Sequence, residues 1–106
     1  MFFELRQYRA RPGKRAEWVE FMEGEIIPFQ LSKGMSIFGS FVAEEEDDLY
    51  VWIRRFESES ERKRLYKEVY ESDEWKNVMG PRVKELLDTD KIVVTRLEAT
   101  QISMMQ

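Results

Sequence analysis

The stretch Leu49–Phe56 constrains the fold of this chain more than any other part of the sequence. Successive side chains of a β-strand point to opposite faces, so Leu49, Val51 and Ile53 form one apolar row. The other row holds Tyr50, Trp52, Arg54 and Phe56. A strand with water on one face alternates apolar with polar residues, whereas this one carries bulky groups on both faces. We therefore predict a central strand in a sheet that is covered on both sides.

Composition limits the classes of function. With 106 residues the chain has the size of one domain, and we assign residues 1–100 to it. Its net charge of −4, with acids and bases interspersed, argues against a nucleic-acid partner. No apolar run is long enough to span a membrane, and charges close to Met1 argue against an export signal, so we predict a cytoplasmic protein.

The chain contains no cysteine and no histidine. Disulfides, thiolate metal sites and cysteine nucleophiles are therefore excluded. The missing histidines remove the commonest general base near neutral pH and the commonest metal ligand. We expect no metal and no cofactor, and any catalysis would depend on carboxylates, tyrosine, arginine or the backbone.

Hydrophobic periodicity predicts four strands and two helical regions. The strands are expected over residues 2–9, 35–43, 49–56 and 91–99. The first helix spans 14–27, with an apolar stripe of Ala16, Val19, Met22 and Ile26, and Pro28 ends or kinks it. The second helical region begins at a capping box, Ser58 to Glu61, and Gly80-Pro81 interrupts it. Residues 101–106 form a tail that the pattern does not assign.

The order β-α-β-β-α-β predicts a ferredoxin-like α+β domain, with a four-stranded antiparallel sheet and both helical regions on one face. We expect the helices to cover the apolar row of Leu49, Val51 and Ile53. The opposite face would then expose a large aromatic patch, which a second copy of the chain would cover. The sequence thus predicts a homodimer through the open sheet face, with a cavity between the two sheets.

Candidate site residues lie on the face expected to line that cavity. The catalytic candidates are Glu4, Arg6 and Tyr8, with Glu4 as a base and the arginine as an anion holder. The ligand-binding candidates are Arg6, Tyr8, Tyr50, Trp52, Arg54 and Phe56. Two structural alternatives stay open: Glu4 and the arginines pair as a salt-bridge network, and the aromatic side chains only fill an interface.

Other features favour structural roles. Trp18 and Trp75 are expected to pack between helix and sheet or between subunits. The acidic run Glu44–Asp48 lacks the spacing of a calcium loop, so it is interpreted as the solvated tip of a hairpin. Arg62-Lys63-Arg64 lies among glutamates and indicates a solvent-facing side of a helix.

Several motifs resemble the NIPSNAP family. The opening Phe3-Glu4-Leu5-Arg6-Gln7-Tyr8 is followed by the turn Arg11-Pro12-Gly13-Lys14, and then by Trp18. Further on, Phe56-Glu57-Ser58 with Glu61-Arg62, and Asp73-Glu74-Trp75, are similar to the family's later motifs. The resemblance covers nearly the whole chain. It departs from the family in the central strand, where Trp52 and Arg54 stand in place of His and Trp.

The resemblance implies a dimeric α+β barrel. It leaves the activity open, because relatives of this fold include cofactor-independent monooxygenases, haem-degrading enzymes and isomerases. Our first hypothesis is a homodimer that binds or transforms a small apolar or aromatic acid or carbonyl compound, as an oxygenase-like enzyme without a cofactor. The alternative is a non-catalytic interaction or structural dimer whose cavity is filled by its own side chains.

Overall fold

The computed structural model describes all residues, 1–106. The strands are β1 (Phe2–Arg9), β2 (Ser36–Val42), β3 (Leu49–Phe56) and β4 (Val93–Leu97). The first helical region comprises α1 (Arg15–Phe21), the π-helical turn η1 (Met22–Ile26) and α2 (Ile27–Ser32). The second comprises α3 (Glu59–Tyr70), the π-helical turn η2 (Trp75–Met79) and α4 (Gly80–Leu86), followed by a short 3₁₀ turn, η3 (Thr89–Lys91). The longest of them, α3, has 12 residues, and none qualifies as a membrane span.

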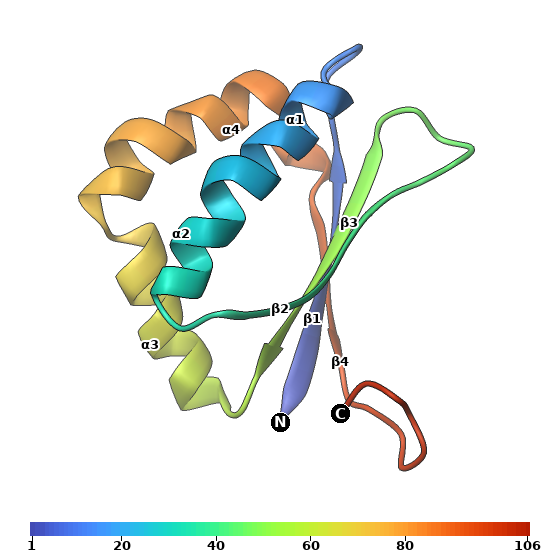
Figure 1. Ribbon diagram of the computed structural model, residues 1–106, viewed down its shortest axis with the longest axis vertical. Coiled ribbons are helices and arrows are strands. Elements are labelled where there is room, and N and C mark those ends of the chain that lie inside the picture. The colour runs from blue at the N-terminus through green and yellow to red at the C-terminus, as the bar shows by residue number, and fades with distance from the viewer.

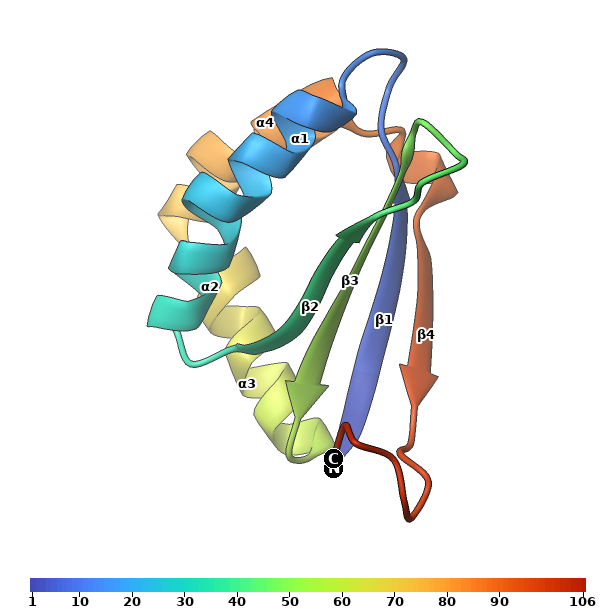
Figure 2. The ribbon, with the colours of Figure 1, turned by 45° about the vertical axis from the view of Figure 1, so that its right-hand side comes forward.

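The architecture confirms the α+β class and the β-α-β-β-α-β order. The four strands pair antiparallel in the order β2-β3-β1-β4, so β1 and β3 are central as expected. All helices lie on one side of the sheet, and the opposite side carries no helix (Figures 1 and 2). The two chain termini lie next to each other at one end of the sheet, beside the start of β1.

The helices cover the sheet face opposite to the one that the sequence analysis assigned to them. Tyr50, Trp52, Arg54 and Phe56 of β3 are buried against the helices, and Glu4 and Tyr8 of β1 are buried with them. Leu49, Val51 and Ile53 lie on the side without helices. The prediction was wrong because it placed the aliphatic row in the core. Large aromatic side chains fill the space between the sheet and the helices, and the smaller aliphatic side chains of β3 lie on the open side.

The open sheet face is apolar and partly covered by the chain's own tail. Phe38, Phe41, Val93 and Leu97 are each between 40% and 53% exposed there. Phe3 on the same face is buried, because the ring of Phe38 packs at 5.5 Å and residues of the segment 97–105 lie over it. Arg55 holds the tail by donating from Nε to the backbone carbonyl of Gln106 at 2.8 Å.

Pro28 and Pro81 do not end their helices, because each is preceded by a π-helical turn. The amide of Ile27 donates to the carbonyl of Met22, and that of Gly80 to the carbonyl of Trp75, five residues back in both cases. A proline ring clashes with the carbonyl four residues earlier in an α-helix, and a wider turn relieves that clash. The helical regions therefore run through Pro28, where the sequence analysis expected an end or a kink, and through Pro81, where it expected an interruption.

The π-helical turns also determine which side chains face the sheet. Side chains four residues apart on an α-helix drift by about 40° per step, or about 120° over three steps. A turn that holds an extra residue reduces this drift. As a result Trp18, Met22, Ile26 and Gln30 are all buried on the side facing the sheet. Trp75, Met79, Val83 and Leu87 form the matching row in the second region, and the predicted stripe through Ala16 and Val19 is displaced.

Candidate functional site

A fully buried arginine, Arg54, lies at the centre of the space between sheet and helices. Its Nη2 donates to Glu4 Oε1 at 2.6 Å and to the hydroxyl of Tyr66 at 2.8 Å. Its Nη1 donates to Gln30 Oε1 at 2.9 Å and to the hydroxyl of Tyr70 at 2.8 Å. The guanidinium also lies 4.6 Å from the centre of the Trp52 ring, a distance typical of cation–π contact. One strand and both helical regions thus supply its partners.

Glu4 balances the charge of Arg54 from the neighbouring strand. The register of β1 and β3 places the two residues directly opposite each other. Tyr66 donates to Glu4 Oε2 at 2.6 Å, so both carboxylate oxygens accept a short hydrogen bond. Burial alone would raise the pKa of Glu4, but the attraction of Arg54, the hydrogen bonds from Tyr66 and Arg54, and the charge of Arg6 hold the pKa below its ordinary value. Glu4 is therefore an ionised carboxylate whose two oxygens are both hydrogen-bonded within the protein.

Arg6 forms the edge of this cluster. Its Nε donates to the hydroxyl of Tyr8 at 2.7 Å, and its Nη1 lies 3.2 Å from the hydroxyl of Tyr66 and 3.4 Å from Glu4 Oε1. Its side chain keeps 17% of its surface exposed, compared with 0% for Arg54. Burial raises the pKa of Tyr8, which therefore keeps its proton near neutral pH.

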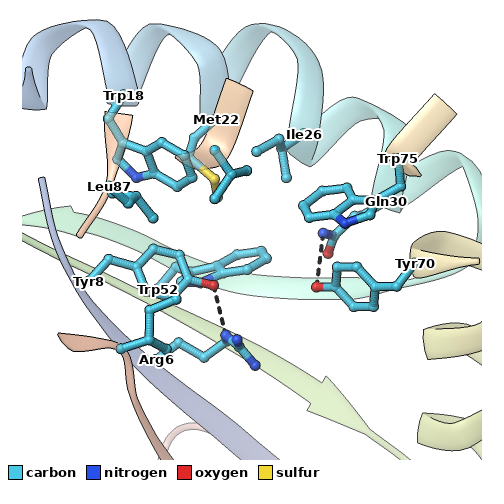
Figure 3. Close-up of a pocket in the computed structure, with 12 residues that line it drawn as sticks. Arg6, Tyr8, Trp18, Met22, Ile26, Gln30, Trp52, Tyr70, Trp75 and Leu87 are labelled. Carbon is cyan, nitrogen blue, oxygen red and sulfur yellow. Dashed lines mark hydrogen bonds between the residues drawn. The ribbon is translucent and has the colours of Figure 1, made fainter. Parts of the chain in front are cut away.

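A cavity of about 90 Å³ lies beside the cluster, between the sheet and the two rows of helical side chains. Figure 3 shows Trp18, Met22 and Ile26 facing Tyr8, Trp52 and Arg6 across it, with Gln30 and Tyr70 hydrogen-bonded at one end. Trp75, Val83, Leu87 and Ile92 complete the lining. All three tryptophans of the chain therefore border the cavity. Its polar groups are Arg6, Tyr8, Gln30 and Tyr70.

The buried polar atoms that lack a partner are all N–H donors. They are Nε1 of Trp18, Nε1 of Trp52 and Nε of Arg54. Both indoles belong to residues that line the cavity. A buried donor without an acceptor costs about 1–3 kcal/mol. Any group that satisfies these atoms has to be a hydrogen-bond acceptor. No group of three or more Asp or Glu side chains is arranged to hold a metal ion.

The structure brings most of the predicted site residues together, though in a different place from the one expected. Glu4, Arg6, Tyr8, Trp52 and Arg54 form one cluster between sheet and helices instead of facing a second sheet. Tyr50 and Phe56 lie on the same face but outside the cavity lining. Tyr50 hydrogen-bonds the Ser40 hydroxyl at 2.6 Å, and burial raises its pKa to about 12.

Sequence reasoning missed Gln30, Tyr66 and Tyr70, which supply most of the helix-side partners of Arg54. A signal was present. Tyr66 and Tyr70 are spaced by one helical turn within an apolar stripe, and Gln30 continues the row from Trp18, so polar atoms on a buried face needed a polar partner across it. Trp18 and Trp75, expected to pack between elements, do so and also line the cavity.

The family model of NIPSNAP matches residues 3–101 of this chain, nearly its whole length. The protein belongs to the NIPSNAP family. Among curated proteins, none matches the chain.

Solved structures share the fold of this NIPSNAP domain. A NIPSNAP family protein of unknown function from Agrobacterium tumefaciens is 22% identical with a TM-score of 0.89, and the match covers 100% of this chain and 94% of that one. A second NIPSNAP family protein from the same organism is 23% identical with a TM-score of 0.88, covering 99% and 98%. An antibiotic biosynthesis monooxygenase is 13% identical with a TM-score of 0.67, covering 94% and 99%. At these identities the likeness concerns the fold alone.

Replacing Glu4 by glutamine should make the free energy of unfolding less dependent on pH in the acid range. Because the folded-state pKa of Glu4 lies below 4.5, its stabilising effect is complete above that pH and is lost as the pH falls through the folded-state pKa. Urea unfolding at about pH 7 should show Glu4→Gln destabilised by about 3 kcal/mol. At about pH 3 the gap from the unmodified protein should narrow. Glu20→Gln, at an exposed glutamate without an ion pair, is the control; an equal effect in both variants would contradict the assignment.

Removing both charges of the buried pair should cost less than removing either one. Arg54→Met and Glu4→Leu should each lower the free energy of unfolding by about 3–5 kcal/mol, since each leaves the other charge buried and unpaired. The double variant should be more stable than either single variant, as measured by a double-mutant cycle in urea. Simple additivity of the two losses would mean that Glu4 and Arg54 do not depend on each other.

Proposed function

We propose that this NIPSNAP family protein binds a small organic acid or carbonyl compound in the cavity between its helices and its sheet. One observation carries the proposal: the buried polar atoms without a partner, two of them on cavity-lining tryptophans, are donors only. Acids and carbonyl compounds bring the acceptor oxygens that such donors need. The remaining walls are aromatic and aliphatic and suit a short apolar body.

The volume of the cavity restricts the ligand. An engineered cavity of about 150 Å³ admits benzene, and ligand pockets for larger molecules measure roughly 300–1,000 Å³. A cavity of about 90 Å³ is smaller than either. The aromatic substrate that a cofactor-independent oxygenase would take therefore fits poorly, and we favour a compact acid or carbonyl compound. Likeness of fold to a monooxygenase at 13% identity does not outweigh this mismatch.

Binding is favoured over proton abstraction as the role of the site. Glu4 is the one carboxylate in the cluster, and its two oxygens already accept from Arg54 and Tyr66. A carboxylate held at a lowered pKa is a weak general base. The donors around the cavity would instead stabilise negative charge on a ligand oxygen.

Tryptophan fluorescence tests the proposal directly, because all three tryptophans border the cavity. Titration with small acids and ketones should change the emission in a saturable way. Val83→Phe, which places a larger group in the lining, should abolish the change while keeping the fold by circular dichroism. A flat titration across all the compounds would favour the alternative, a non-catalytic interaction or structural dimer with a filled cavity.

We further propose that the protein forms a homodimer through the open sheet face. Phe38, Phe41, Val93 and Leu97 leave large apolar surfaces on that face. Contiguous patches of this kind are uncommon on monomers, and two sheets pack face to face at about 10 Å through such rows. The expected dimer interface thus uses the open sheet face, whereas the face that carries Tyr50, Trp52 and Phe56 belongs to the core of each subunit.

Native mass spectrometry of Val93→Glu tests this interface. The unmodified protein should have the mass of two chains, and the variant that of one, because an unpaired carboxylate would be buried between the sheets. Val78→Glu makes the same substitution at a valine that is 60% exposed on the helical side, and it should stay dimeric. A monomeric unmodified protein, or a dimeric Val93→Glu variant, would overturn the proposal.

A further inference from the structure

We infer that the ligand of the cavity is a short-chain monocarboxylate, held through its charge by Arg6. This inference rests on the proposed function and narrows it, because it selects an anion among the acids and carbonyl compounds that the cavity could accept. Three independent features of the site support it: the charge balance of the cluster, the free donor capacity beside the cavity, and the volume.

The cluster carries one unbalanced positive charge. Arg6 and Arg54 are both protonated, because a guanidinium does not lose its proton in proteins. Glu4 is their one carboxylate partner, and it pairs with Arg54 at 2.6 Å but with Arg6 only at 3.4 Å. A buried charge without a close partner is costly. A monoanion beside Arg6 would bring the cluster to neutrality, whereas a neutral carbonyl compound would leave the charge uncompensated.

Arg6 is the arginine that can receive this anion. It belongs to the lining of the cavity, and Arg54 does not. Arg6 donates from Nε and Nη1 within the chain, which leaves Nη2 without a partner. All five donor hydrogens of a guanidinium point outward in its plane, so Nη2 remains available to a carboxylate oxygen. Its side chain is also 17% exposed, so Arg6 is less enclosed by protein than Arg54.

The indoles of Trp18 and Trp52 make the site selective for acceptors. Their N–H groups are buried without a partner and can only donate. An ammonium or a guanidinium group would meet further donors in this cavity, together with the charge of Arg6. A carboxylate has acceptor capacity on both oxygens and no donor. The donor set therefore excludes cations and disfavours amides, which bring two N–H hydrogens of their own.

The volume limits the length of the chain that follows the carboxylate. Benzene has six carbons and occupies a cavity of about 150 Å³, so about 90 Å³ corresponds to roughly four heavy atoms. Acetate and propionate are close to this size, and benzoate exceeds it. The apolar wall opposite Arg6, formed by Met22, Ile26 and Leu87, would contact the short alkyl group.

Tryptophan fluorescence and isothermal titration calorimetry with matched probes test the inference. Acetate and propionate are compared with acetamide and propionamide, which have nearly the same shape but no charge, and with butanone and benzoate. At constant ionic strength, propionate should bind at least about tenfold more tightly than propionamide or butanone, because charge-assisted hydrogen bonds are the stronger ones. Benzoate should bind more weakly than propionate.

Substitution of Arg6 assigns the recognition to one residue. Arg6→Gln should lose the preference for propionate over propionamide, and Arg6→Lys should retain part of it. Arg9→Gln, a matched change on the same strand at an arginine paired with Glu46 and Asp48, should keep the full preference. Circular dichroism and urea unfolding of each variant separate loss of binding from loss of fold.

The outcomes distinguish this inference from the function on which it rests. If no acid, amide or ketone binds, water alone fills the cavity, and both the proposed function and the inference are wrong. If butanone or propionamide binds as tightly as propionate, the proposed function stands and the anion inference fails. Tighter binding of benzoate would refute the size limit, and an unchanged preference in Arg6→Gln would refute the role of Arg6.

Discussion

The arrangement of strands and helices depends on how the buried guanidinium of Arg54 is hydrogen-bonded. Arg54 has no exposed surface, so its charge must be compensated by groups that the fold brings to it. Glu4 comes from the neighbouring strand, Gln30 from the first helical region, and Tyr66 and Tyr70 from the second. The pairing of β1 with β3, and the position of both helical regions over the sheet, are therefore coupled through a single side chain. If any one of these elements moved away, Arg54 would lose a hydrogen-bond partner while its charge stayed buried.

The cavity and the cluster are consequences of the same arrangement. Aromatic residues on both central strands hold the helices away from the sheet, and the helical side chains fill most of the space between them. The part left unfilled borders Arg6, the one member of the cluster whose charge is poorly compensated. The NIPSNAP fold of this chain thus combines a centre in which Arg54 is paired closely with Glu4 and an edge at which the charge of Arg6 is poorly compensated, and the proposed binding function belongs to that edge.

The sequence predicted the topology well and the orientation of the sheet badly. The order of elements, the central position of Leu49–Phe56 and the grouping of Glu4, Arg6, Tyr8 and Arg54 on one face follow from periodicity, and all are present. Periodicity does not say which face the helices cover. That choice depends on the polar atoms of the helices. Gln30, Tyr66 and Tyr70 hydrogen-bond a buried arginine, and they would find no hydrogen-bond partner against aliphatic side chains. The π-helical turns could not be predicted either, because the search for an apolar stripe assumes a constant number of residues per turn.

Each of the two π-helical turns accommodates one residue that a regular α-helix could hold only by turning its later side chains away from the sheet. Gln30 reaches Arg54 only because the turn Met22–Ile26 holds one residue more than an α-helical turn would. If the same residues formed a regular α-helix with none removed, everything beyond them would rotate by about 100°, and the Gln30 amide would turn away from the sheet. The same holds for Trp75–Met79 and the residues of α4. Deletion of the extra residue within the turn would therefore leave a regular α-helix that still directs Gln30 to Arg54, whereas a deletion between Ile27 and Gln30 would rotate Gln30 away from the sheet.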